Sequence, residues 1–181
     1  MWEFERYDWS RLRAARSAAG IPAAITELVN ATTSEEADAA YWKIDNEVVV
    51  QGALFESALP TTRCLTIALH RCTPAARPRV LELLVQLASG EAHPNEIEQG
   101  NAGIAGACGR ELIAIAGLLF DLIERVGPDE DDLCVDLLGL CARHHHELRE
   151  RVCWHLRQFT TRSKDSNHEK LVAGWIQELE M

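Results

Sequence analysis

A run of three histidines, His144-His145-His146, is the first group in this sequence that could bind a metal ion. Neighbouring residues of a helix point about 100° apart, so three adjacent histidines on one helix cannot converge on a single ion. The run lies between two predicted helices, where a solvated turn is the simpler interpretation. We therefore expect no metal site and no other cofactor.

Two cysteines have a histidine two positions away, as a Cys–His enzyme could use: Cys72 with His70, and Cys153 with His155. Residues two apart on a helix do not face each other, and neither pair lies in the glycine-flanked turn that often presents a nucleophile. The six cysteines contain no C-x-x-C pair, which favours reduced, buried thiols over a disulfide framework. These residues do not predict nucleophilic catalysis.

The glycine-rich stretch G-N-A-G-I-A-G-A-C-G at 100–109 precedes a predicted helix, as a phosphate-binding loop would. It lacks the G-K-[S/T] ending and follows no predicted strand, and a phosphate loop needs both features. The paired carboxylates at Asp129–Asp132, Glu35-Glu36 and Asp45/Glu47 are mostly best explained as charges at helix N-termini. We therefore expect that the chain is not an enzyme.

The acidic residues are more informative. The chain has 28 acidic and 18 basic residues, for a net charge of −10. Such a balance disfavours nucleic acid as a partner, because binding to phosphates needs clustered Lys and Arg. It suits a basic protein, whose approach an acidic surface accelerates. The alternative is that the acidity serves solubility alone.

Three predicted helices each carry a polar stripe at helical spacing. In chain order the stripes are Glu35, Asp38, Trp42 and Asp45; Arg79, Glu82 and Gln86; and Asp132, Asp136 and Arg143. If these helices line one side of a stacked array, the stripes form one broad acidic face. The residues predicted to bind a partner there are Trp42, Asp45, Glu82, Gln86, Asp132 and Asp136, with Trp42 as the residue that becomes buried. The alternative for each single residue is the solvated side of an amphipathic helix.

The helices that would position these stripes come from an internal repeat. Aligning Pro74 with Pro128 places Glu82 on Asp136, within the similar phrases L-E-L-L-V-Q-L-A and V-D-L-L-G-L-C-A. Each unit of the repeat predicts a long helix, a Pro-marked turn and a second helix. Because neither helix can bury its apolar face alone, we expect such pairs to stack.

The predicted fold class is all-α, with about nine helices and no convincing sheet. The expected helices are Asp8–Ala19, a helix starting at Ile21-Pro22, Ser34–Ile44, a long helix from Val48 to Cys72 kinked near Pro60, Arg79–Ala88, Ile104–Val126, a helix opening at Asp129–Asp132, Glu147–Thr161 and His168–Leu179. An extended conformation at Val48–Val50 remains an alternative, although a lone strand would have no partner.

We expect one repeat domain over residues 1–181. It comprises an N-terminal helix in 1–20, helical pairs in 21–161 with an inserted loop near 90–103, and a capping helix in 162–181. The N-terminal sequence M-W-E-F-E-R-Y-D-W mixes acidic and aromatic residues, unlike a signal peptide, and no stretch approaches the ~18 apolar residues of a membrane span. We expect a cytoplasmic protein without membrane contact.

Several phrases resemble those of a group of bacterial HEAT-repeat proteins: I-P at 21–22, Y-W-K-I-D-N at 41–46, V-V-V-Q-G at 48–52 and L-F-E-S-A at 54–58. The later R-P-R-V-L-E-L-L-V-Q-L-A and V-D-L-L-G-L-C-A-R are similar to the same group. The resemblance implies a HEAT-like α-solenoid of about four helical pairs in a right-handed superhelical stack, without a catalytic motif. Several small acidic members of the group act as immunity proteins beside polymorphic or contact-dependent toxins.

This resemblance and the acidic stripes favour an immunity protein that binds and neutralises a basic toxin domain. A general scaffold or adaptor that binds a peptide or subunit on the same surface is the alternative, and a small toxin gene immediately upstream would favour the first. A relative of the HEAT-like DNA glycosylases is disfavoured, because that fold binds DNA with basic residues and the stripes here are acidic. The sequence leaves the oligomeric state open.

Overall fold

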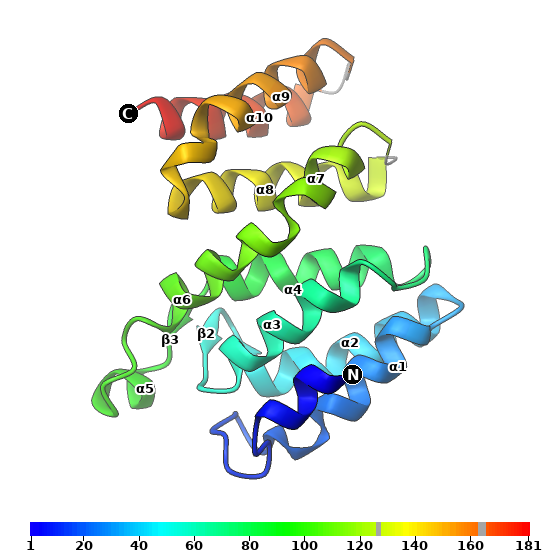
Figure 1. Ribbon diagram of the computed structural model, residues 1–181, viewed down its shortest axis with the longest axis vertical. Helices are drawn as coiled ribbons and strands as arrows, with labels where there is room; N and C mark the ends of the chain where they lie inside the picture. Colours follow the sequence, from blue (N-terminus) through cyan, green and yellow to red (C-terminus); the bar gives the residue numbers. More distant parts are fainter. Residues whose placement is uncertain (126–127, 163–165) are drawn as a thin grey trace. The chain divides into compact units, whose positions relative to one another are not determined.

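The protein is predominantly helical in a computed structural model, as the sequence predicts (Figure 1). The structure describes residues 1–125, 128–162 and 166–181. The described residues form two compact units, Met1–Glu111 and Leu112–Met181. The single repeat domain expected from the sequence stays a prediction. Among the described residues, no helix is both long and apolar enough to cross a bilayer.

Paired helices form most of the first unit, in which α1 packs against α2 and α3 packs against α4 (Figure 1). Its elements are η1 (Trp2–Arg6), η2 (Ala18–Gly20), α1 (Ile21–Asn30), α2 (Ser34–Val48), β1 (Val49–Val50), β2 (Ala53–Leu54), α3 (Ala58–Leu69), α4 (Arg77–Ser89), β3 (Glu91–Ala92), α5 (Pro94–Glu98) and α6 (Ile104–Glu111). Further contacts join α1 to α3 and α2 to α4, so the two pairs share one core.

Local signals account for the helices that agree with the prediction. Pro22 lies in the first turn of α1, where no amide donor is needed. The Thr33 side chain caps α2 by accepting a hydrogen bond from the amide of Glu36, and Glu35 and Glu36 place negative charge at the positive end of the helix dipole. Each of these signals lies within one turn of the helix end that it fixes.

The predicted long helix from Val48 to Cys72 is wrong. The chain there forms the short strands β1 and β2 before α3 begins, so the extended alternative applies at Val49–Val50. β1 pairs antiparallel with β2, and β2 pairs parallel with β3. The partner of Val49–Val50 is therefore Ala53–Leu54 in the same segment, and the third strand comes from the 90–103 segment, which the sequence predicts only as a loop. Pro60 does not kink a long helix, because it lies in the first turn of α3.

The predicted helix Asp8–Ala19 is also wrong. Residues 7–17 form turns and extended backbone between η1 and η2. Their amides donate to acceptors outside the segment: Ala15 to the carbonyl oxygen of Glu47, and Arg16 and Ser17 to Oε2 of the Glu47 carboxylate, each at 2.9 Å. Backbone amides that donate to these acceptors cannot also form the i to i−4 hydrogen bonds of an α-helix.

The second unit begins inside the helix predicted from Ile104 to Val126. That helix is broken into α6, a 3₁₀ turn and α7, and Val126 lies outside the described residues. The elements of this unit are η3 (Leu112–Ile115), α7 (Ala116–Leu122), α8 (Pro128–His144), η4 (His146–Leu148), α9 (Arg149–Arg162) and α10 (Ser166–Glu180). In its core α8 packs against α7, α9 and α10.

The last helix faces inward much as predicted. On α10, Val172 and Leu179 are buried, and Leu171, Trp175 and Ile176 are half-buried. Trp175 packs on Gly139 of α8, where no side chain intervenes between the ring and the helix backbone. The α8–α10 contact therefore depends on a glycine.

Candidate partner-binding groove

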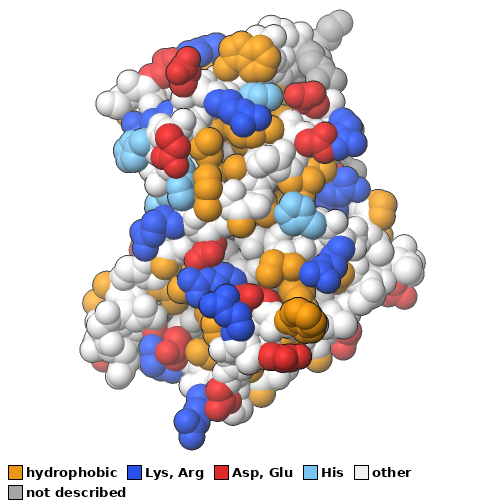
Figure 2. All heavy atoms as spheres, in the orientation of Figure 1, with side chains coloured by type: hydrophobic (Ala, Val, Ile, Leu, Met, Phe, Trp, Pro, Cys, Tyr) orange, Lys and Arg blue, Asp and Glu red, His pale blue; other side chains and the backbone are white. Residues whose placement is uncertain are grey.

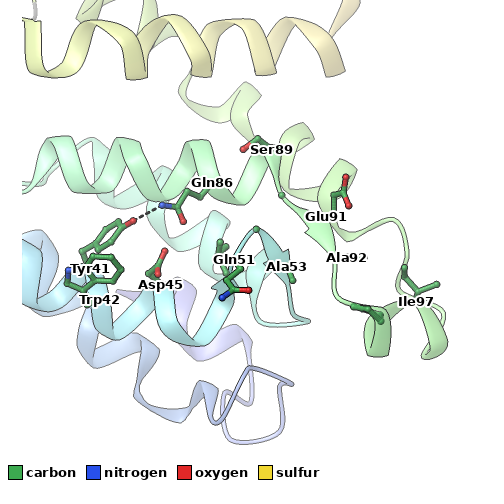
Figure 3. A pocket seen from close by; sticks show the side chains of 14 residues that line it. Tyr41, Trp42, Asp45, Gln51, Ala53, Gln86, Ser89, Glu91, Ala92 and Ile97 are labelled. Atoms are coloured by element: carbon green, nitrogen blue, oxygen red, sulfur yellow. Dashed lines mark hydrogen bonds between the residues drawn. The ribbon is translucent and has the colours of Figure 1, made fainter.

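A groove with a volume of about 750 Å³ lies on the first unit, between α2, α4 and the small sheet (Figure 3). Tyr41, Trp42 and Asp45 of α2 line it together with Gln86 of α4. Gln51, Glu91 and Ile97 extend its lining across the β1–β2 turn, β3 and α5. We refer to this site as the α2/α4 groove.

Three of the residues predicted to bind a partner, Trp42, Asp45 and Gln86, line the α2/α4 groove. The Trp42 side chain is 55% exposed, so a partner could bury most of its ring. The Asp45 carboxylate is half-buried beside it. The structure thus brings residues of the first two polar stripes together, and their binding of a partner stays a prediction.

Glu82, a fourth predicted residue, belongs to a polar network that joins α2 to α4. The Tyr41 hydroxyl donates to Glu82 Oε1 at 3.2 Å and accepts from Gln86 Nε2 at 2.6 Å. Arg79 also pairs with Glu82, and its Nε donates to Asp38 Oδ1 at 2.5 Å. The Glu82 carboxylate is therefore already engaged within the protein, and it does not line the groove.

Burial and neighbouring carboxylates shift the proton affinities of two groove residues. Burial, with smaller contributions from the negative charges of Asp45 and Glu82, raises the pKa of Tyr41, so its hydroxyl keeps its proton at neutral pH. Burial also raises the pKa of Asp45; a hydrogen bond with Tyr41 opposes this shift and the charge of Glu82 adds to it. An opposite charge that entered the groove would favour the ionised form of Asp45.

The charges that line the groove have one sign. Asp45 and Glu91 are its ionisable carboxylates, and its lining, all of it within the described residues, contains no Lys, Arg or His. On the face drawn in Figure 2, by contrast, Lys and Arg side chains are interspersed with Asp and Glu. The groove is thus a local acidic feature and fits a basic ligand.

The remaining predicted residues, Asp132 and Asp136, lie on α8 in the second unit. Trp175 Nε1 donates to Asp136 Oδ1 at 2.8 Å, and the Arg143 guanidinium lies 4.8 Å from the Trp175 ring centroid. Burial is the main cause of the raised pKa of Asp136. Asp132 is exposed, with His168 Nε2 3.2 Å from its carboxylate. One continuous face over all three stripes stays a prediction.

The other residues considered for chemistry lie in structural positions. His144 ends α8 and His146 begins η4, so the histidine run occupies a turn, and the described residues hold no group of three potential metal ligands. Burial raises the pKa of the Cys153 thiol, one of the two cysteines considered as nucleophiles, and raises that of the buried Cys108 thiol to about 11. Such thiols stay protonated at neutral pH and are poor nucleophiles.

The β1–β2 turn places Gln51 in an unusual backbone conformation at the groove. Gln51 and Gly52 have φ angles of 53° and 80°, and Val50 pairs with Ala53 across them. Positive φ at both central positions is the pattern of a type I′ hairpin, in which Asn-Gly is preferred. A left-handed conformation costs a residue such as Gln about 1 kcal/mol. Backbone strain of this kind often marks binding sites.

We expect Gln51→Asn to raise the free energy of unfolding by about 0.5–1 kcal/mol, because Asn tolerates the left-handed region better than Gln. Urea unfolding measures the change. Gln51→Ala is the matched control, because it removes the carboxamide and keeps the backbone penalty. Equal stabilities of the Asn and Ala variants would show that the turn is not strained.

The α2/α4 groove combines an exposed indole, carboxylates and an exposed aliphatic side chain, a set suited to binding a surface or an extended chain. Comparisons of the chain with protein-family models, with curated proteins and with solved structures found no match.

Proposed function

We propose that the chain is a non-enzymatic, HEAT-like protein-binding module of the immunity type, which binds and neutralises a toxin through the α2/α4 groove. The observation that carries the proposal is the groove itself, where Trp42, Asp45 and Gln86 lie together. Exposed aromatic side chains are frequent hot spots of protein interfaces, and the acidic lining suits a basic partner. The stacked α1/α2 and α3/α4 pairs support the HEAT-like part of the proposal.

A general scaffold or adaptor that uses the same groove is the second candidate. The groove supports it equally, because a subunit or peptide needs the same exposed indole and carboxylates. The two candidates differ in the consequence of binding. An immunity protein abolishes the activity of one cognate toxin, whereas an adaptor leaves its partner active.

We expect Trp42→Ala to weaken binding of the cognate toxin roughly 30-fold or more, since truncating a central aromatic anchor costs about 2 kcal/mol or more. Where a small toxin gene lies immediately upstream, its product is the candidate toxin. Its expression should inhibit growth, co-expression of the unaltered chain should restore growth, and Trp42→Ala should fail to do so. Calorimetry with an inactivated toxin gives the affinity.

Trp154→Ala provides the matched control, because Trp154 is 56% exposed and lies on the second unit, away from the groove residues in sequence. Loss of protection by both variants would indicate a general effect of removing an exposed indole. Full protection and unchanged affinity for Trp42→Ala would exclude the groove as the toxin-binding site. A toxin that is bound but still inhibits growth would favour the adaptor.

A further inference from the structure

We propose that the α2/α4 groove binds an arginine or lysine side chain, carried on an extended segment of the partner protein, between the Trp42 ring and the Asp45 carboxylate. This inference rests on the proposed function and names the chemistry that the partner must present. It is carried by the shape of the groove, by its charge and by two arginine sites that the chain already contains.

The first of these arginine sites lies next to the groove. The Arg79 guanidinium lies 5.2 Å from the ring centroid of Tyr41 while it pairs with the carboxylates of Asp38 and Glu82. A cation over an aromatic face gains from the negative charge of the π system, and a nearby carboxylate adds direct attraction. Ring, cation and carboxylate together hold α2 against α4.

The second arginine site repeats this arrangement in the other unit. Arg143 lies over Trp175, and its Nε and Nη2 donate to the Glu178 carboxylate at 2.7 and 3.0 Å. The Trp175 indole itself donates to Asp136. An arginine between an aromatic ring and a carboxylate is therefore a contact that this chain forms twice within itself.

Trp42 and Asp45 provide the ring and the carboxylate of a third such site. They lie three positions apart on α2 and so share a face of the helix. The Trp42 ring meets Tyr41 edge-on, with centroids 4.9 Å apart and planes at 86°, and this contact restricts the orientation of the indole. The described residues that line the groove include no Lys, Arg or His, so a cation between Trp42 and Asp45 would come from a ligand.

The length of the groove indicates an extended segment instead of a single small cation. Figure 3 shows Trp42 and Asp45 at one end of the site, and Glu91 and Ile97 at the other. The Glu91 carboxylate and the exposed Ile97 side chain offer a second charged contact and an apolar one. A partner segment that places a basic residue at Trp42 can also contact Glu91 and Ile97 if it runs along the small sheet.

Titration with matched peptides tests the proposal on the full-length protein. The probe is an acetylated and amidated Gly-Gly-Arg-Gly-Gly peptide, and its control carries citrulline, which has nearly the same shape without the charge. The readout is the indole N–H resonance of Trp42, assigned by its loss in Trp42→Phe. We expect the arginine peptide to shift this resonance and the citrulline peptide to leave it unchanged.

The role of Asp45 is tested with Asp45→Asn, which keeps the shape of the side chain and removes its charge. We expect this variant to weaken arginine-peptide binding roughly tenfold, and to weaken binding of the toxin by a similar factor. Glu35→Gln is the matched control, because it removes an exposed carboxylate from the same helix outside the groove lining. The affinity of Glu35→Gln for the arginine peptide and for the toxin should equal that of the unaltered chain.

Three results would overturn the proposal. The arginine and citrulline peptides could shift the Trp42 resonance equally, or the arginine peptide could leave it unshifted at concentrations up to about 10 mM. The third is that Asp45→Asn binds the arginine peptide as tightly as the unaltered chain does. Tighter binding of spermidine than of the peptide would assign the groove to a small polycation instead. If Trp42→Ala abolishes toxin binding while Asp45→Asn does not, the proposed function stands and the cationic ligand is wrong. If the peptide binds but Trp42→Ala leaves toxin binding intact, the proposed function fails at this groove.

Discussion

Replacing Arg13 by Ala is expected to lower the free energy of unfolding by about 3 kcal/mol, the lower end of the range for breaking a buried ion pair. The Glu96 carboxylate is only 1% exposed, and Arg13 donates to both of its oxygens, from Nε at 2.8 Å and Nη2 at 2.7 Å. Without Arg13, the Asn101 amide, at 2.9 Å, is the one remaining side-chain donor to this carboxylate among the described residues. Arg13 itself is 42% exposed, which moderates the effect.

The effect of Arg13→Ala should depend on pH in a defined direction. The hydrogen bonds from Arg13 hold the pKa of Glu96 below its ordinary value of 4.5. A depressed carboxyl pKa contributes stability above the unfolded-state pKa, and this stability is lost as the pH falls through the folded-state value. The stability difference between the unaltered chain and Arg13→Ala should therefore be full at neutral pH and shrink below about pH 4.5.

Urea unfolding at several pH values measures this difference. Arg11→Ala is the control from the same segment, because Arg11 and its partner Asp8 are both exposed. Exposed pairs contribute less than about 1 kcal/mol. If Arg13→Ala destabilises no more than Arg11→Ala, or if its effect is independent of pH, the buried pair does not stabilise the first unit.

This ion pair also explains why two segments were predicted incorrectly. Arg13 and Glu96 are 83 positions apart, and each lies in a segment whose local pattern indicates something else, a helix for 8–19 and a plain loop for 90–103. Their conformations follow from pairing with each other and with the small sheet. Contacts so distant in sequence leave no periodic signal to read.

The helices with local end signals were predictable, and the small sheet was only partly so. Pro22 and Thr33 mark the starts of α1 and α2 within a residue or two. The phrase V-V-V-Q-G-A-L contains a usable hairpin signal, because a glycine-containing pair of residues separates two apolar runs. Its parallel partner β3, which follows α4, could not be identified from the sequence around β1.

The groove was partly visible in the helical spacing of its residues. Trp42 and Asp45 share a face by periodicity, and Gln86 lies on the matching stripe of α4, so pattern alone places them near one another. Gln51 and Ile97 were missed, because they come from a turn and a short helix whose positions depend on the tertiary fold. The sequence signal that could have identified Gln51 is the Gln51-Gly52 pair itself, which lies between the β-branched V-V-V and the small Ala53 as a hairpin turn would.

The two residues that the internal repeat aligns, Glu82 and Asp136, share a role in helix packing, while their binding of a partner stays a prediction. Glu82 and Asp136 occupy equivalent positions, and each accepts a hydrogen bond from an aromatic side chain of a neighbouring helix, Tyr41 or Trp175. The packing of these helices therefore explains why the repeat has a carboxylate at both positions. Charge reversal at these two positions would disturb folding together with any binding, so Trp42 and Asp45 give cleaner tests of the partner site.

Gly139→Ala is expected to destabilise the second unit by about 3 kcal/mol. A Cβ atom at residue 139 would lie 2.1 Å from Cδ2 of Trp175 and 2.4 Å from its Cε3, far inside contact distance. The indole is held by its bond to Asp136 and by the Arg143 guanidinium, so it cannot move without losing both. Overpacking of a fitted interface costs about 1–3 kcal/mol, and these lost contacts place the variant at the upper end.

Hydrogen exchange of the amides in α8 and α10 is the suitable measurement, because it reports on the second unit separately from the first. Gly174→Ala is the matched control: a Cβ there meets no atom within 4 Å, and alanine favours a helix by about 1 kcal/mol over glycine. Protection should therefore fall in Gly139→Ala and rise slightly in Gly174→Ala. Equal protection in the two variants would contradict the close packing of Trp175 on α8.

A double variant separates this contact from a general intolerance of alanine at position 139. Leucine at position 175 is smaller than the indole, so Trp175→Leu should be destabilising alone but should leave room for a Cβ on α8. Adding Gly139→Ala to Trp175→Leu should then cost less than about 1 kcal/mol, a coupling of about 2 kcal/mol between the two sites. Strictly additive effects would mean that Gly139 is needed for the conformation of α8 itself and not for its contact with α10.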